Sequence, residues 1–175
     1  MYTKDILQDG FGRVREGVKH VLTGLNLEQL TYRPDKEANS IAWLVWHLSR
    51  VQDDHIAEVA GEEQVWLKAG WSKRLDLGLE PEDTGYGHKP GDIERVRAEA
   101  GELRAYHDEV FAQTVKFLEA PAGEDFDRVV DERWDPPVTL GVRLVSVLSD
   151  DLQHVGQAAY LRGLLERAGV GKSQP

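Results

Sequence analysis

The sequence predicts an all-α protein, a four-helix bundle with a long crossover between its second and third helices. Seven prolines divide the 175 residues into segments, and four long proline-free stretches repeat apolar residues every three or four positions. No segment alternates apolar and polar residues convincingly, which argues against a β-sheet. Four amphipathic helices in a chain of this length fit one bundle, so we expect residues 1–175 to form a single domain.

The first two predicted helices have clear ends. The first spans about residues 4–22 and stops before Gly24. The second opens at Asn39 and Ser40, which are good N-terminal caps, and ends at Gly61. The first apolar stripe consists of Ile6, Phe11, Val14, Val18 and Val21, and the second of Ile41, Leu44, Val45, Leu48, Val51 and Val59.

The third predicted helix follows Pro90, with Asp92 as its cap, and continues to Phe117. The fourth follows the cap residue Thr139 and repeats apolar residues to Leu165, a length of about 40 Å. Two connections remain, residues 61–90 and 120–138. The first is long enough to be a crossover that also roofs a pocket, and its aromatic residues are Trp66, Trp71 and Tyr86.

Composition excludes several classes of function. The chain has 21 basic and 31 acidic residues and a net charge of −10, so it offers no concentrated basic face for nucleic acid. It has no cysteine, which excludes disulfides, cysteine zinc sites and a cysteine nucleophile. The uncharged stretch 38–49 is far shorter than the roughly 18 residues of a membrane span. Since residues 1–5 lack a signal-peptide pattern, we expect a cytoplasmic protein that binds no membrane.

Three polar residues interrupt the apolar faces of the second and fourth helices. Asp150 and His154 are one helical turn apart on the core-facing stripe, and His47 lies among large apolar side chains. If the two helices pack together, these side chains can converge on one metal ion. Three protein ligands are typical of a catalytic metal, and the N,N,O set suits zinc, nickel, iron or manganese. A hydrogen-bonded polar cluster is the alternative, and Asp151 could replace Asp150 as the carboxylate.

Other polar residues are secondary candidates. Asp54 lies on nearly the same face as His47 and could orient a ligand imidazole or act as an acid or base, unless it only pairs with Arg50. Arg143 could hold an anionic ligand at the pocket entrance or be an ordinary exposed arginine. Among the remaining histidines, we expect His55 at the rim and His107 on the surface. His88 lies in a predicted loop that could reach the pocket mouth, but a solvated loop is the favoured interpretation.

Two segments carry a resemblance to a known family. Residues 39–48, preceded by residues 30–34, and residues 150–157, followed by residues 160–162, resemble the DinB-like superfamily. The similarity is closest to the branch of mycothiol-dependent maleylpyruvate isomerases and uncharacterised actinobacterial relatives. It implies a four-helix bundle holding a divalent metal through His47, Asp150 and His154. Many members have histidine at position 150, and the isomerase branch usually has glutamate. Aspartate is one methylene shorter, so either the helix sits closer or the metal binds more weakly.

The resemblance also implies chemistry and partners. Superfamily members with known activity look like transferases or isomerases that use a low-molecular-weight thiol, mycothiol or bacillithiol, and a small electrophile. Zinc or nickel then comes before iron or manganese as the expected metal, and Gln157, Asp54 or Arg143 would orient the substrate or the thiol. A metal-dependent hydrolase and a non-catalytic metal-binding stress-response protein remain as alternatives. Because family members often pair, we also expect a homodimer.

Overall fold

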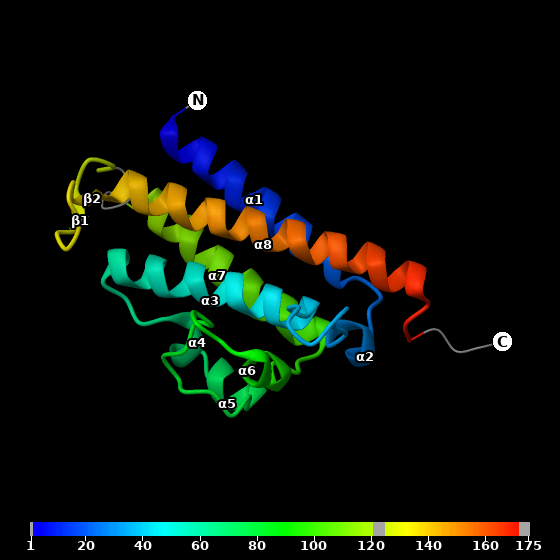
Figure 1. Cartoon of the computed structure of the whole chain (residues 1–175). Coiled ribbons are helices and arrows are strands. Elements are labelled where there is room, and N and C mark those ends of the chain that lie inside the picture. Colours follow the sequence, from blue (N-terminus) through cyan, green and yellow to red (C-terminus); the bar gives the residue numbers. More distant parts are fainter. Residues whose placement is uncertain (1, 121–124, 172–175) are drawn as a thin grey trace.

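Four long helices form the protein in a computed structural model that describes residues 2–120 and 125–171. They are α1 (Thr3–Leu22), α3 (Ile41–Ala60), α7 (Ala100–Glu119) and α8 (Leu140–Ala168), which run side by side as a bundle (Figure 1). Both α3 and α1 pack against α7 and α8. The predicted all-α four-helix bundle is therefore confirmed. No helix of the described ranges is long and apolar enough to cross a membrane.

The predicted caps set the bounds of the two helices that carry the candidate ligands. The Ser40 and Thr139 hydroxyls accept hydrogen bonds from the third amide of α3 and of α8. Gly61 and Gly169 end these helices in the left-handed conformation, with φ of 65° and 72°. Because these local signals are strong, the sequence-predicted ends of both helices agree with the structure within a few residues.

The crossover between α3 and α7 contains three short helices, α4 (Val65–Lys68), α5 (Trp71–Leu75) and α6 (Pro90–Arg95). Figure 1 places them against α3 on the side away from α1, and α4 contacts both α3 and α7. Trp66 and Trp71 are buried in this layer, at 3% exposure each. One more short helix, α2 (Leu27–Leu30), lies between α1 and α3.

Three expectations about the elements were wrong. The third helix is divided, because the chain leaves helical geometry after Arg95 and resumes at Ala100; Val96 and Ala98 are buried there in a non-helical segment, a pattern that mimics helical periodicity. Ile6 is 57% exposed, because the buried face of α1 begins at its neighbour Leu7 and continues through Phe11. The connection after α7 contains a small antiparallel hairpin, β1 (Val129–Asp131) with β2 (Val138–Thr139), which is too short to give an alternating pattern.

The core consists of two apolar clusters, and α3 contributes to both. Residues 41–46 and Leu48 belong to the larger cluster, and Ile56 and Val59 belong to the smaller one. Between them along α3 lie buried polar side chains. A buried polar group must find a partner or pay the cost of desolvation. The partners of these side chains therefore show which of them stabilise the fold and which can serve a functional site. The buried polar residues of α3 are His47, Ser49, Arg50, Gln52 and Asp53.

Candidate metal centre

His47, Asp150 and His154 converge in the structure. One potential ligand atom from each lies within 4.8 Å of the others, and they form the one such group of three or more in residues 2–120 and 125–171. His47 comes from α3 and is 3% exposed, while the other two are one turn apart on α8 and half-buried. Packing of α3 against α8 brings them together.

Neighbouring groups orient the His47 ring. Its Nδ1 lies 2.5 Å from the backbone carbonyl oxygen of Thr84. A carbonyl can only accept, so Nδ1 carries the proton and Nε2 presents a lone pair. Trp43 stacks on the ring at 4.6 Å between centroids and 14° between planes. Burial lowers the pKa of His47 despite the Thr84 hydrogen bond, which keeps the imidazole in the neutral form that a metal needs.

The His154 ring is held in an equivalent way. Its Nδ1 donates to Gln157 Oε1 at 2.9 Å, and its Nε2 lies 3.6 Å from Asp150 Oδ1. The His47 and His154 rings are nearly perpendicular, with centroids 4.8 Å apart. Both imidazoles therefore use Nδ1 for an oxygen acceptor, which is the usual support of a metal-ligating histidine.

Asp150 supplies the carboxylate of the set. Its Oδ2 is buried and has no hydrogen-bond partner among the described residues. Burial alone would raise the pKa of Asp150, but the contact with His154 and the nearby His47 hold it below its usual range. The contact with Asp150 also raises the pKa of His154. Two nitrogen lone pairs and one uncompensated carboxylate oxygen fit a divalent cation in an open, three-ligand site.

Asp151, the alternative carboxylate, does not belong to the cluster. Its side chain is completely buried, and neither oxygen has a hydrogen-bond partner in the described part of the chain. Burial, with a contribution from Asp150, raises the pKa of Asp151 well above its usual value, which disfavours the charged form that a metal ligand needs. The geometry therefore selects Asp150 over Asp151 as the candidate ligand.

The secondary candidates have definite partners. Gln157 contacts the His154 ring, and Asp54 accepts a hydrogen bond from Gln64 at 2.7 Å. Arg50 pairs with Asp53 at 3.6 Å. Arg143 is only 8% exposed, so it is not an ordinary surface arginine. Its guanidinium contacts His55, Glu58 and Asp131, and this set of contacts occupies it inside the protein.

Two expectations about the other histidines were wrong. His88 was expected in a solvated loop before a place at the pocket mouth, but its side chain is only 6% exposed and lies beside Trp43 and Trp46. His107 is 1% exposed, and its Nδ1 bonds Ser49 Oγ on α3 at 3.0 Å. It faces inward because α7 turns its Tyr106–His107 side toward α3, which its charged sequence neighbours concealed.

Sequence reasoning missed Thr84 and Gly85 as parts of the site. Thr84 acts through its backbone carbonyl, which no side-chain pattern reveals. Gly85 has a φ of 97° and is buried against His47. A glycine on each side of Tyr86 was the one available signal of an unusual backbone conformation.

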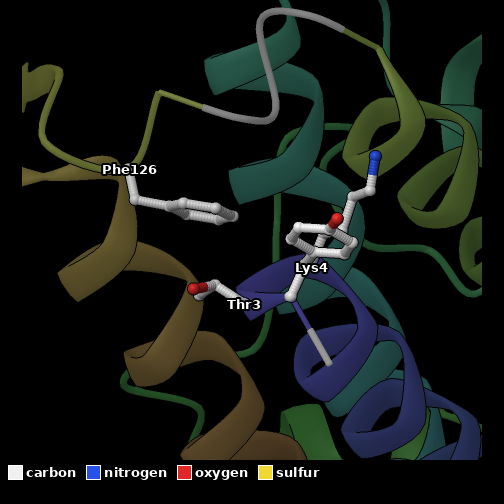
Figure 2. A pocket seen from close by; sticks show the side chains of 4 residues that line it. Thr3, Lys4 and Phe126 are labelled. Carbon is white, nitrogen blue, oxygen red and sulfur yellow. The ribbon is translucent and has the colours of Figure 1, made fainter.

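A separate cavity lies at the beginning of α1, away from the candidate ligands. It has a volume of about 420 Å³ and is lined by Tyr2, Thr3, Lys4 and Phe126 (Figure 2). None of these residues orients His47 or His154, and their side chains provide no cluster of metal-ligating groups. We therefore assign the candidate chemistry to the α3–α8 site.

The bundle and its His/Asp/His set define a DinB-like protein with a candidate metal centre between its second and fourth long helices. The profile of the mycothiol-S-transferase family, a DinB-like family, matches residues 6–167, and the chain belongs to that family. The chain is also similar to a conserved protein from Enterococcus faecalis of known crystal structure, with 30% identity and a TM-score of 0.86. That match covers 93% of this chain and 96% of the other. No curated protein matches.

Proposed function

We propose that the protein is a metal-assisted S-transferase that joins mycothiol, or a related low-molecular-weight thiol, to a small electrophile. The observation that carries this proposal is the convergence of His47, Asp150 and His154, with Asp150 Oδ2 left without a partner within the described ranges. Family membership supports the thiol. An isomerase that uses the same thiol addition is the nearest variant.

These three side chains would hold the cation, with zinc or nickel as the proposed metal. A divalent cation at this site would bind the thiol sulfur, lower its pKa and present a thiolate at neutral pH. Thr84 and Gln157 keep the two imidazoles in the required tautomer. The chain contains no cysteine, so the thiol must come from solution.

Tyr86 is the proposed contact for the incoming electrophile. It is 63% exposed, and its ring meets the edge of His47 at 5.3 Å between centroids. Burial, and after it the nearby charge of Asp150, raises the pKa of Tyr86, so its phenol stays protonated and can donate a hydrogen bond. Asp54 and Arg143 would then act indirectly, through Gln64 and His55.

Chlorodinitrobenzene is a suitable test electrophile. In the transfer, the thiol loses its proton to solvent, a carbon–sulfur bond forms, and chloride leaves with its bonding electrons. We expect turnover by the zinc- or nickel-loaded protein only when thiol is present, and loss of at least about tenfold in kcat/KM for His154→Ala. Asp151→Asn is the matched control, because Asp151 lies on α8 beside Asp150 but outside the cluster.

The outcome distinguishes the alternatives. Equal turnover without thiol would contradict the transferase and favour the hydrolase. Metal binding without turnover on thiol and several electrophiles would leave the non-catalytic metal-binding protein. The homodimer, the single-domain organisation and the cytoplasmic location stay predictions, and a mass near 20 kDa by light scattering would contradict the dimer.

A further inference from the structure

One turn of the crossover lies directly on His47. Its backbone carbonyl at Thr84 accepts the His47 Nδ1 proton. Gly85, the next residue, packs so closely that a Cβ added to it would lie 2.7 Å from His47 Nδ1 and 3.1 Å from the Trp46 ring. No side chain fits there, and the φ of 97° disfavours one. The shape of this turn therefore limits where the His47 ring can be.

Two side chains of the same segment hold the Thr84 carbonyl in place. Asp83 accepts a hydrogen bond from the Gly85 amide through Oδ1 and from His88 Nε2 through Oδ2, both at 2.8 Å. The His88 Nδ1 accepts from the Trp43 indole nitrogen at 3.0 Å. Since an indole can only donate, His88 has its proton on Nε2 and must donate to Asp83. The donor and the acceptor of each hydrogen bond in this series are therefore determined.

The turn is also fastened to the body of α3. Arg50 is completely buried, and its Nε donates to the Asp83 carbonyl oxygen at 3.0 Å. The His88 ring stacks on Trp46 at 5.7 Å between centroids and 15° between planes. Trp43, Trp46, His47 and Arg50 lie at helical spacing, so the turn contacts one face of α3.

We infer that Asp83, Thr84, Gly85 and His88, which we call the His47 turn, form a positioning unit for the candidate ligand His47. The Thr84 carbonyl sets the tautomer, and the Gly85 backbone limits the ring position. The Asp83–His88 pair and Arg50 hold both in register with α3. This inference rests on the proposed function only where it treats His47 as a ligand. The tautomer and ring position are properties of the metal-free protein.

Gly85→Ala is the direct test, with Gly87→Ala as its matched control. Both glycines have positive φ, 97° and 76°, but a Cβ at Gly87 meets nothing within 4 Å. The control therefore carries the backbone strain without the collision. The tautomer of His47 is measured from its ring nitrogen-15 shifts in the metal-free protein. Zinc affinity is measured by competition with a chromophoric chelator. We expect Gly85→Ala to lose the Nδ1-protonated form and about tenfold or more in zinc affinity, and the control to keep both.

His88→Phe tests the same unit by another route and serves if Gly85→Ala does not fold. Phenylalanine keeps an aromatic ring against Trp46 but loses the bonds to Trp43 and Asp83. We expect a mixture of His47 tautomers and weaker zinc binding, with helix content unchanged by circular dichroism. If His47 keeps its tautomer and zinc affinity stays within twofold in the folded variants, the inference is wrong. If the wild-type protein binds neither zinc nor nickel, the proposed function fails, and the metal-free tautomers still decide the positioning role.

Discussion

Buried carboxylates on α3 and on α8 differ in how their hydrogen-bonding capacity is met. On the crossover side, Asp53 accepts hydrogen bonds from the amides of Val65 and Trp66 and from the Tyr106 hydroxyl, all at 2.8–2.9 Å. Arg50 lies 3.6 Å from the same carboxylate. On the α8 side, Asp150 Oδ2 and both oxygens of Asp151 have no hydrogen-bond partner among residues 2–120 and 125–171.

The difference assigns two roles to buried carboxylates of one bundle: Asp53 stabilises the fold, and Asp150 can bind a ligand. The Asp53 carboxylate, with three hydrogen bonds and one ion pair, fastens the crossover to α3 and has no free oxygen for a ligand. A carboxylate oxygen that is buried without a donor costs stability unless something else binds it. A cation at Asp150 would supply that partner. The following predictions test whether the two sides differ in this way, beginning with the largest effect.

Asp53→Asn should be the most damaging substitution. It removes the charge that faces Arg50 and points amide hydrogens at groups that already donate, so we expect a loss of about 3–5 kcal/mol in the free energy of unfolding. Urea denaturation measures it. Asp54→Asn is the neighbouring control, since Asp54 is half-buried with one hydrogen bond to Gln64, and it should lose less than about 1 kcal/mol. Equal effects at the two positions would refute the role of Asp53.

His107 on α7 is one of several residues outside α8 that have a buried polar atom without a partner among the described residues; in His107 that atom is Nε2. Burial lowers the pKa of His107 from 6.5 to about 4. The folded state therefore binds fewer protons than the unfolded state, and the stability contribution, complete above pH 6.5, is lost as pH falls toward 4. We expect a loss of about 3 kcal/mol across this interval. His107→Leu should flatten the pH dependence of urea unfolding, whereas parallel curves for the two proteins would count against the prediction.

Metal addition should stabilise the protein through the candidate site between α3 and α8. With zinc at about 100 times its Kd, the protein should gain about 2.7 kcal/mol, and a chelator should reverse the gain. Asp150→Asn should remove most of this stabilisation, while Asp151→Asn should retain it, because only Asp150 lies in the cluster. Thermal unfolding with and without zinc measures the effect. A gain retained by Asp150→Asn would place the metal elsewhere.

Asp151→Asn should have the smallest effect on the metal-free protein. The substitution replaces a carboxyl group, whose charged form burial disfavours, by an amide of similar size, and no hydrogen bond to the described residues is lost. We expect a change below about 1 kcal/mol, against the large loss for the same substitution at Asp53. Urea unfolding of the two variants side by side provides the comparison. A loss at Asp151 as large as that at Asp53 would mean that Asp151 has an essential partner.

Local signals predicted most of the helices and the candidate ligand set. The caps at Ser40 and Thr139 and the glycine at position 61 act within a single turn, so the sequence alone reveals them. Asp150 and His154 share a face by helical spacing, and His47 was visible as a polar residue in an apolar run. The break between α6 and α7 was not visible, because buried residues outside a helix can recur at helical intervals.

The sequence by itself determined the helical bundle and the three side chains that could hold a metal, because periodicity and capping are properties of neighbouring residues. Only the tertiary structure decided which buried polar groups become hydrogen-bond or ion-pair partners of one another. It turned His107 inward, committed Arg143 to Glu58 and Asp131, and brought the Thr84 carbonyl onto His47. These contacts join residues 12 to 85 positions apart or depend on how one helix face meets another. Their partners are selected by packing, which no local pattern records.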